Sequence, residues 1–169
     1  MIVVHSGFGD DYDSIRDNLW NLVTMARLKY PEYSLHFTGH SLGGALATLA
    51  SLEAVYSLKY DNVTIVTFGS PRVGGVMFAY TWNTLLSSRS LRLVHEFDLV
   101  PHLPPSKIGF SHVGMEVWQH KGHIEKCRES IEDPSCSYSV PFIEGVVSDH
   151  FEYIGIKFNC TSVPKELLE

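Results

Sequence analysis

Apolar positions in the first part of the chain recur with the period of an α-helix. Between residues 12 and 26 they are spaced by three or four residues, which places them on one face of a helix. These positions are Tyr12, Ile15, Leu19, Leu22, Val23 and Ala26. We expect this amphipathic helix to end before Pro31. A short β-type run over residues 2–4 precedes it and predicts a strand.

Strand-like and helix-like segments then follow one another along the chain. Short β-branched or aromatic runs predict strands over residues 33–38, 62–68, 91–97 and 112–118. Apolar segments with good helix formers predict helices over residues 45–54 and 73–86. This alternation is typical of βαβ units, so we expect an α/β fold with a mostly parallel sheet. Active-site residues would lie on loops at the carboxyl ends of its strands.

The pentapeptide Gly39-His40-Ser41-Leu42-Gly43 lies between a predicted strand and a predicted helix. A G-x-S-x-G sequence in that context is typical of a nucleophile elbow, a sharp turn that holds the serine in strained backbone geometry. Residues without a Cβ can pass close to the turn, so we interpret both flanking glycines as sites of close approach.

Length and charge limit the classes of protein that fit. The chain of 169 residues, 44% of them hydrophobic, has the size of one domain with a sizeable core. A formal net charge of −6 without a cluster of Lys or Arg argues against a nucleic-acid partner. No stretch reaches the roughly 20 apolar residues of a transmembrane helix. No secretory signal is visible at the start of the chain, so any such signal would lie upstream.

The three cysteines are Cys127, Cys136 and Cys160. The first two bracket a polar, turn-rich segment that a disulfide would close. Cys160 is then left over, and it is free, pairs with another molecule, or has a partner that this chain lacks. Two glycosylation sequons, at Asn62 and Asn159, weakly favour secretion.

A serine nucleophile needs a histidine to accept its proton and a carboxylate to orient that histidine. In α/β hydrolases the order along the chain is Ser, then Asp or Glu, then His, which excludes the histidines before Ser41 as the base. Asp98 is the preferred acid because it follows a predicted parallel strand. Glu96 is placed inside that strand, and Asp133 lies in the loop between the two cysteines.

Spacing alone leaves the base open among the later histidines, which are His102, His112, His120, His123 and His150. A zinc site is an alternative interpretation of four residues in this region, His120, His123, Cys127 and Cys136. Their spacing matches no zinc pattern, and a disulfide loop with surface histidines accounts for them equally well. We therefore expect neither a metal nor an organic cofactor.

Three segments together resemble the fungal-type class 3 lipases. They are residues 39–47 (GHSLGGALA), 68–74 (FGSPRVG) and 98–105 (DLVPHLPP), and residues 4–8 (VHSGF) and 148–153 (SDHFEY) add to them. The resemblance extends over nearly the whole chain, and it implies an α/β-hydrolase fold with residues 1–169 as one partial catalytic domain. Members of that family carry a further N-terminal part with sheet strands, a lid helix and a second oxyanion donor. We therefore expect this chain to be a fragment, an incomplete gene product or a naturally shortened relative.

The same resemblance implies a role for individual residues. Ser41 would be the nucleophile, Asp98 the triad acid and His150 the general base. The backbone N–H of Leu42 would donate to the oxyanion, and Val147 would line the acyl pocket. Cys127 and Cys136 match the family's late disulfide, and Cys160 matches a cysteine that usually pairs near the N-terminus.

The function that these expectations favour is a carboxylic ester hydrolase of the triacylglycerol-lipase type. It would form an acyl-enzyme on Ser41, act on acyl-ester lipids at a lipid–water interface, and be extracellular through a signal peptide upstream. Two alternatives remain open from the sequence. One is a feruloyl-type esterase on the same fold, and the other is a non-catalytic lipase-like protein that binds lipid or a partner. Oligomeric state is not indicated.

Overall fold

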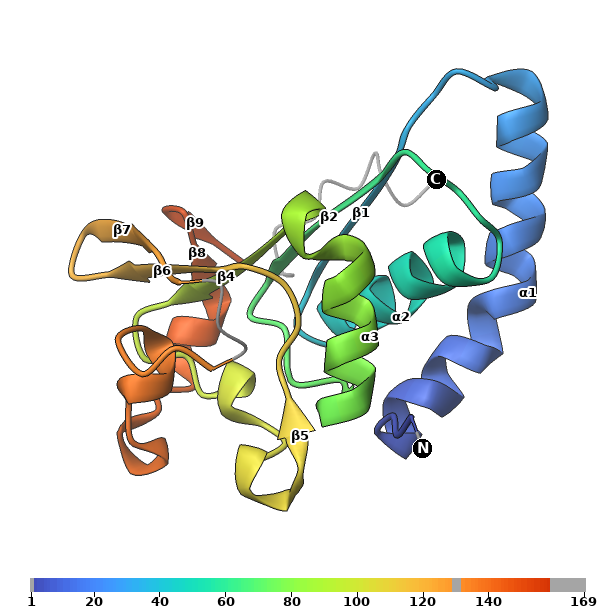
Figure 1. The fold of residues 1–169 in the computed structure, drawn as a ribbon. Helices are drawn as coiled ribbons and strands as arrows, with labels where there is room; N and C mark the ends of the chain where they lie inside the picture. Colours follow the sequence, from blue (N-terminus) through green and yellow to red (C-terminus); the bar gives the residue numbers. More distant parts are fainter. Residues whose placement is uncertain (1, 129–131, 159–169) are drawn as a thin grey trace.

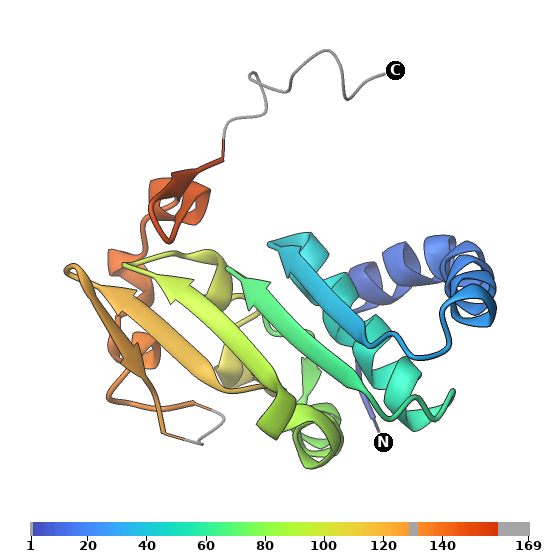
Figure 2. The same ribbon diagram turned by 90° about the horizontal axis from the view of Figure 1, so that it is seen from above.

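The computed structural model describes residues 2–128 and 132–158. Cys160 and the sequon at Asn159 lie outside these residues. The centre of the molecule is a five-stranded sheet in the order β1-β2-β4-β6-β7 (Figures 1 and 2). Its strands are β1 (Leu35–His40), β2 (Val63–Phe68), β4 (Ser90–His95), β6 (Glu116–His120) and β7 (His123–Lys126). The first four run parallel, and β7 returns antiparallel to β6.

Helix α1 (Ser6–Lys29) precedes β1, α2 (Leu42–Tyr56) connects β1 to β2, and α3 (Val76–Leu86) lies between β2 and β4. Helix α2 packs directly on β1 and β2, and α1 packs on α2 (Figure 1). Small residues of α2, among them Ala45 and Ala54, are completely buried and let the helix approach the sheet closely. Phe78 and Trp82 of α3 complete this core, and Leu35 and Phe37 of β1 are partly buried against it.

Short elements make up the remainder. The two-residue strands β3 (Gly74–Gly75) and β5 (Phe110–Ser111) pair with each other, as do β8 (Glu152–Tyr153) and β9 (Ile156–Lys157). The 3-10 helices are η1 (Ser87–Arg89), η2 (Val100–His102), η3 (Ser106–Ile108), η4 (Ser137–Ser139), η5 (Phe142–Glu144) and η6 (Ser148–Phe151). Within the residues described, no helix is both long and apolar enough to cross a membrane.

The N-terminal strand predicted over residues 2–4 is wrong. Val4 forms one isolated bridge with Gly74, and α1 begins at Ser6, so that Gly7 and Gly9 lie inside the helix. The segment has only the two-residue β3 beside it, too short a partner for a ladder of hydrogen bonds. The predicted helix end before Pro31 is confirmed, because α1 ends at Lys29.

Two later predictions are also corrected. Strand β4 ends at His95, and Glu96 lies in the following turn with a φ of 42°, so Glu96 is not inside the strand. Strand β6 begins at Glu116 rather than at residue 112, and the buried His112 precedes it. The predicted bridge between Cys127 and Cys136 is confirmed, with their Cα atoms 6.0 Å apart.

Candidate active site

Ser41 occupies the turn between β1 and α2 with φ 56° and ψ −126°. A positive φ with this ψ is rare for a residue with a side chain and is the strained geometry expected of an elbow. Gly39 is required for it, because an added Cβ would lie 2.1 Å from the carbonyl oxygen of Gly43. Gly43 itself has open space around it, so our interpretation of that glycine is wrong. The close approach belongs to Gly44, where a Cβ would lie 2.9 Å from that of Ser70.

Leu42 is the first residue of α2. A backbone N–H at that position has no acceptor within its own helix, and the helix dipole favours negative charge there. The N–H of Ser41 is already used, since it donates to the carbonyl of Phe68 at 3.0 Å. The turn thus presents the N–H of Leu42 next to the serine.

Asp98 lies beyond the carboxyl end of β4 and is completely buried. Its Oδ2 accepts hydrogen bonds from His150 Nδ1 at 2.8 Å and from the hydroxyl of Tyr153. Its Oδ1 accepts from the N–H of Val100 at 2.9 Å. Burial, followed by the negative charge of Asp98, raises the pKa of the Tyr153 hydroxyl, so that Tyr153 remains a donor. Three donors therefore occupy the two carboxylate oxygens of Asp98.

His150 is in η6 and is almost completely buried. Because its Nδ1–H donates to Asp98, its Nε2 is left as the proton acceptor. The ring of His40, the neighbour of Ser41, lies 4.3 Å from that of His150, and His40 Nε2 donates to the carbonyl of His150 at 2.8 Å. These contacts bring the His150 loop to the elbow. The Ser41 hydroxyl makes no hydrogen bond to His150 within the described residues, and such bonds are often loose before substrate binds.

Asp149 holds the same loop against the end of β4. Its carboxylate accepts the N–H of Phe97 at 3.1 Å, and its carbonyl accepts Nδ1–H of His95 at 3.0 Å. The N–H of Val146 donates to the carbonyl of Phe97 at 2.7 Å. The carboxylate of Asp149 is therefore used for backbone attachment, while that of Asp98 faces the histidine.

Comparison with known proteins agrees with this geometry. Residues 1–108 match the model of the family described as lipase (class 3). The chain belongs to the class 3 lipase family. It is 40% identical over 161 residues to a lipase from Rhizomucor miehei, and this alignment covers 90% of this chain and 43% of that protein. It is 36% identical over 149 residues to a secreted mono- and diacylglycerol lipase 2 from Gibberella zeae, covering 79% of this chain and 36% of that one.

Solved structures of lipases show the same fold. The lipase from Rhizopus microsporus var. chinensis superimposes with a TM-score of 0.83 and 37% identity, covering 91% of this chain and 55% of that one. A triacylglycerol lipase whose catalytic centre is described as a serine protease triad superimposes with a TM-score of 0.83 and 38% identity. The match covers 91% of this chain and 60% of that one. The chain therefore has the α/β-hydrolase fold, and it spans less than half the length of the curated relatives it matches.

The other candidate histidines of this lipase family member lie apart from Asp98. His112 is buried and donates from Nε2 to the carbonyl of Pro101 at 2.7 Å, and His120 Nδ1 lies 2.9 Å from Glu96 Oε2. His102 borders a separate cavity, and His123 is exposed on β7. Among the described residues, the side chains that hydrogen-bond to Asp98 are those of His150 and Tyr153.

The alternative carboxylates and the alternative zinc site are explained by other contacts. Glu96 accepts the N–H of Lys121 at 2.8 Å, and Asp133 binds Arg128 and Ser135 inside the disulfide loop. The sulfur atoms of Cys127 and Cys136 are bonded to each other, so neither is the free thiolate that a zinc site requires.

Two residues next to Asp98 and His150 were not recognised from the sequence. Tyr153 donates to Asp98, and a Cβ at Gly69 would lie within 2.9 Å of Asp98 Oδ2, His150 Nδ1 and the Tyr153 hydroxyl. Gly69 also has a φ of 56°. The signals were the glycine directly after β2 and a tyrosine three residues after His150. Val147 lies three residues before His150 and is exposed.

Proposed function

We propose that this chain is the catalytic part of a carboxylic ester hydrolase of the triacylglycerol-lipase type. Ser41 is its nucleophile, His150 its general base and Asp98 the acid that orients the base. The observation that carries the proposal is the 2.8 Å hydrogen bond from His150 to a fully buried Asp98, on loops that meet the elbow of Ser41. Residues 1–169 form one domain in this proposal.

In the first half of the reaction, Ser41 Oγ attacks the ester carbonyl carbon while His150 Nε2 takes its proton. The carbonyl oxygen becomes an oxyanion, which accepts a hydrogen bond from the N–H of Leu42. The bond from carbon to the alcohol oxygen then breaks, and His150 returns the proton to that oxygen. The alcohol leaves, and the acyl group remains on Ser41.

In the second half, a water molecule gives a proton to His150 Nε2 and attacks the acyl carbon. The bond to Ser41 Oγ breaks, the proton returns to the serine, and the fatty acid leaves. The negative charge of Asp98 stabilises the charged imidazole in both halves. Each residue ends in the state in which it began.

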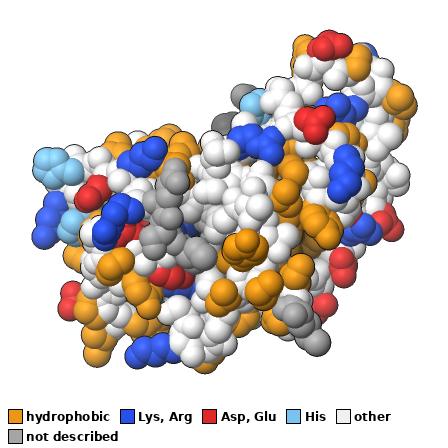
Figure 3. Space-filling view, viewed as in Figure 1, with side chains coloured by type: hydrophobic (Ala, Val, Ile, Leu, Met, Phe, Trp, Pro, Cys, Tyr) orange, Lys and Arg blue, Asp and Glu red, His pale blue; other side chains and the backbone are white. Residues whose placement is uncertain are grey.

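The substrates we propose are acyl-ester lipids at a lipid–water interface, met outside the cell. The relatives named above as lipases, one of them described as secreted, support this class of substrate. Hydrophobic side chains also gather on the surface around α3 (Figure 3). Large exposed hydrophobic residues include Met77 of α3, Ile108 and Phe142. We assign Val147, exposed three residues before His150, to the wall that contacts the acyl chain.

The proposal is tested with a fluorophosphonate, which reacts with activated serines whatever the substrate. We expect one adduct on Ser41 by peptide mass spectrometry, and we expect Ser41→Ala to abolish it and to lower ester hydrolysis by about 10⁴-fold or more. Ser148→Ala is the matched control, because it changes an exposed serine two residues from His150. A folded protein that shows no adduct, or full esterase activity in Ser41→Ala, would contradict the assignment. Comparing long-chain glycerides with aryl esters then separates a lipase from a feruloyl-type esterase.

A further inference from the structure

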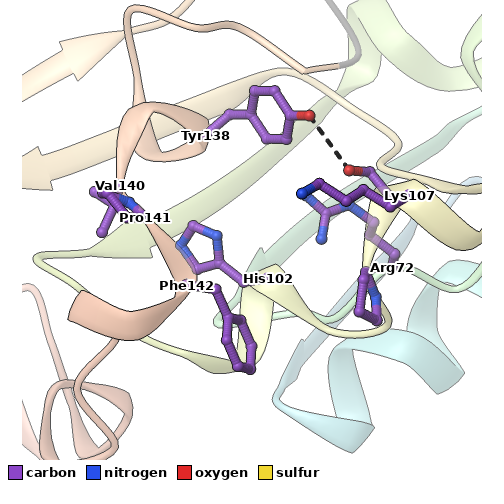
Figure 4. A pocket seen from close by; sticks show the side chains of 9 residues that line it. Arg72, His102, Lys107, Tyr138, Val140, Pro141 and Phe142 are labelled. Carbon is purple, nitrogen blue, oxygen red and sulfur yellow. Dashed lines mark hydrogen bonds between the residues drawn. The ribbon is translucent and has the colours of Figure 1, made fainter.

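A cavity of about 500 Å³ lies between the segment that follows Asp98 and a segment that precedes His150 in the chain. One wall comes from the segment after Asp98, with His102, Ser106 and Lys107, and the other from residues 138–142 (Figure 4). We call this cavity the basic pocket. Its volume is within the roughly 300–1,000 Å³ typical of sites for small molecules.

Basic groups dominate the polar lining of the basic pocket. Figure 4 shows Arg72 and Lys107 together on one side, with the ring of His102 between them and the opposite wall. The carboxylate of Glu132 is already bound, because it accepts Nε and Nη2 of Arg72 at 2.8 and 2.9 Å and also the N–H of His112. Glu132 thus pairs with Arg72, whereas Lys107 is in none of the ion pairs among the described residues, so its charge is left to attract an anion.

Arg72 retains hydrogen-bonding capacity. A guanidinium has five N–H hydrogens, of which two bind Glu132 and one binds the carbonyl of Pro104 at 3.2 Å. Two hydrogens remain, and the side chain is buried, so its charge is little screened by water. Burial, followed by the positive charge of Arg72, lowers the pKa of His102, so this ring lines the pocket as a neutral hydrogen-bonding group at neutral pH.

The remaining lining is apolar. Val140, Pro141 and Phe142 form the wall opposite the basic side chains, and Pro105 adds to it. The ring of Tyr138 lies 5.9 Å from the guanidinium of Arg72, and its hydroxyl lies 3.3 Å from Ser106 Oγ. A ligand for this pocket therefore combines an anionic head with a hydrocarbon body.

The two walls are joined to the triad through the backbone. Helix η2 begins two residues after Asp98, and Val146, four residues after Phe142, forms a bridge with Asp98. We propose that the basic pocket binds the free fatty acid that ester hydrolysis releases, with its carboxylate at Arg72 and Lys107 and its chain against Phe142. This inference rests on the proposed function, because that function supplies the fatty acid.

Binding can be tested without catalysis, using the Ser41→Ala protein and decanoate kept below its aggregation concentration, by isothermal titration calorimetry. We expect saturable binding at one site, about tenfold weaker for decanol, which lacks the carboxylate. Lys107→Glu should weaken decanoate binding by about tenfold or more, because it places a like charge beside the carboxylate. Phe142→Asp should weaken it similarly. Lys121→Glu is the matched control, since it makes the same charge change in the turn between β6 and β7.

The outcomes separate the alternatives. Decanoate that does not bind, or that binds Lys107→Glu and Phe142→Asp as tightly as the parent protein, would overturn the inference. Equal binding of decanol would overturn the role of the carboxylate, and displacement of decanoate by inorganic phosphate at similar concentration would show a general anion site instead. The fluorophosphonate reaction of Ser41 is measured separately, so failure of the proposed function is distinguishable from failure of the pocket.

Discussion

At the scale of single residues, Asp98 and Asp149 are two carboxylates near one histidine, and they accept hydrogen bonds from different kinds of donor. Asp98 is fully buried, and all its hydrogen bonds come from groups that stabilise its negative charge, one of them His150. Asp149 adjoins His150 in sequence, but its carboxylate accepts a backbone N–H from Phe97. Proximity in sequence to the histidine therefore says less about a catalytic role than the identity of the donor that the carboxylate accepts from.

This difference predicts unequal effects of two isosteric substitutions. Asp98→Asn removes the charge that stabilises the protonated His150 and favours the wrong tautomer, so kcat should fall by roughly 10³- to 10⁴-fold. Asp149→Asn keeps an oxygen that can accept the N–H of Phe97, and kcat should fall by less than about tenfold. The measurement is hydrolysis of a soluble short-chain ester by both variants at matched fold content. Comparable losses would mean that the two carboxylates share the role.

The residues of the site could be predicted from the sequence only in part. Chain order and strand position select Asp98, but five histidines satisfied the same order, and only the resemblance to a family selected His150. The glycine after β2 and the tyrosine after His150 are visible in the sequence, but the roles of Gly69 and Tyr153 could not be assigned from it, because these roles depend on contacts with Asp98 across 29 and 55 residues of sequence. Such contacts follow from tertiary packing and leave no local periodic signal.

At the scale of the elements, the turn from β1 to α2 depends on one of its two flanking glycines. Gly39→Ala would place a Cβ 2.1 Å from a backbone oxygen, which cannot move away without breaking the start of α2. We expect it to lower the free energy of unfolding by at least about 3 kcal/mol, or to prevent folding. Gly43→Ala has open space in the first turn of a helix and should raise the free energy of unfolding by about 0.5–1 kcal/mol.

Urea unfolding of the two alanine variants provides the measurement, and each variant is the control for the other. Stability rather than activity is the proper readout, because Gly43 adjoins the residue proposed to bind the oxyanion. A Gly43→Ala protein as unstable as Gly39→Ala would show that the elbow needs both glycines, as the sequence pattern alone suggests.

Strand and helix alternation was predictable because each element is long enough to show its own period. Helices α1, α2 and α3 and strands β1, β2 and β4 all appear near their predicted positions. The errors concern short segments whose state depends on a neighbour. The run at residues 2–4 has β-strand propensity, but its partner strand has only two residues. Glu96 lies within the strand-like run of residues 91–97, although the chain has already turned there.

At the scale of the whole molecule, buried histidines link stability to pH. Burial lowers the pKa of His40, His102 and His112, and for His112 the positive charges of Arg92 and Arg72 add to the effect. An unfolded chain binds protons to these groups near pH 6.5, whereas the folded chain resists doing so. The contribution of these neutral histidines to the free energy of unfolding is therefore complete above about pH 6.5. It is lost as the pH falls toward their lowered pKa values.

Carboxyl groups also make the free energy of unfolding fall as the pH falls, but in a lower range of pH. Ion pairing with Arg92 lowers the pKa of Glu116 in spite of its burial, and Arg128 and Ser135 lower that of Asp133. The stability that these groups contribute is lost only as the pH falls below about 4.5. The interval from pH 6.5 to 5 consequently reports mainly on the histidines.

The largest share in that interval should come from His112, the most deeply buried of the three. His112→Gln keeps a donor for the carbonyl of Pro101 but cannot titrate, so the decline in the free energy of unfolding should become shallower by up to about 1.4 kcal/mol per pH unit. Urea unfolding at several values between pH 7 and pH 5 measures this slope. His123→Gln, at an exposed position on β7, should leave it unchanged. An unaltered slope in His112→Gln would mean that the folded protein accommodates the charged imidazole, contrary to the buried setting seen here.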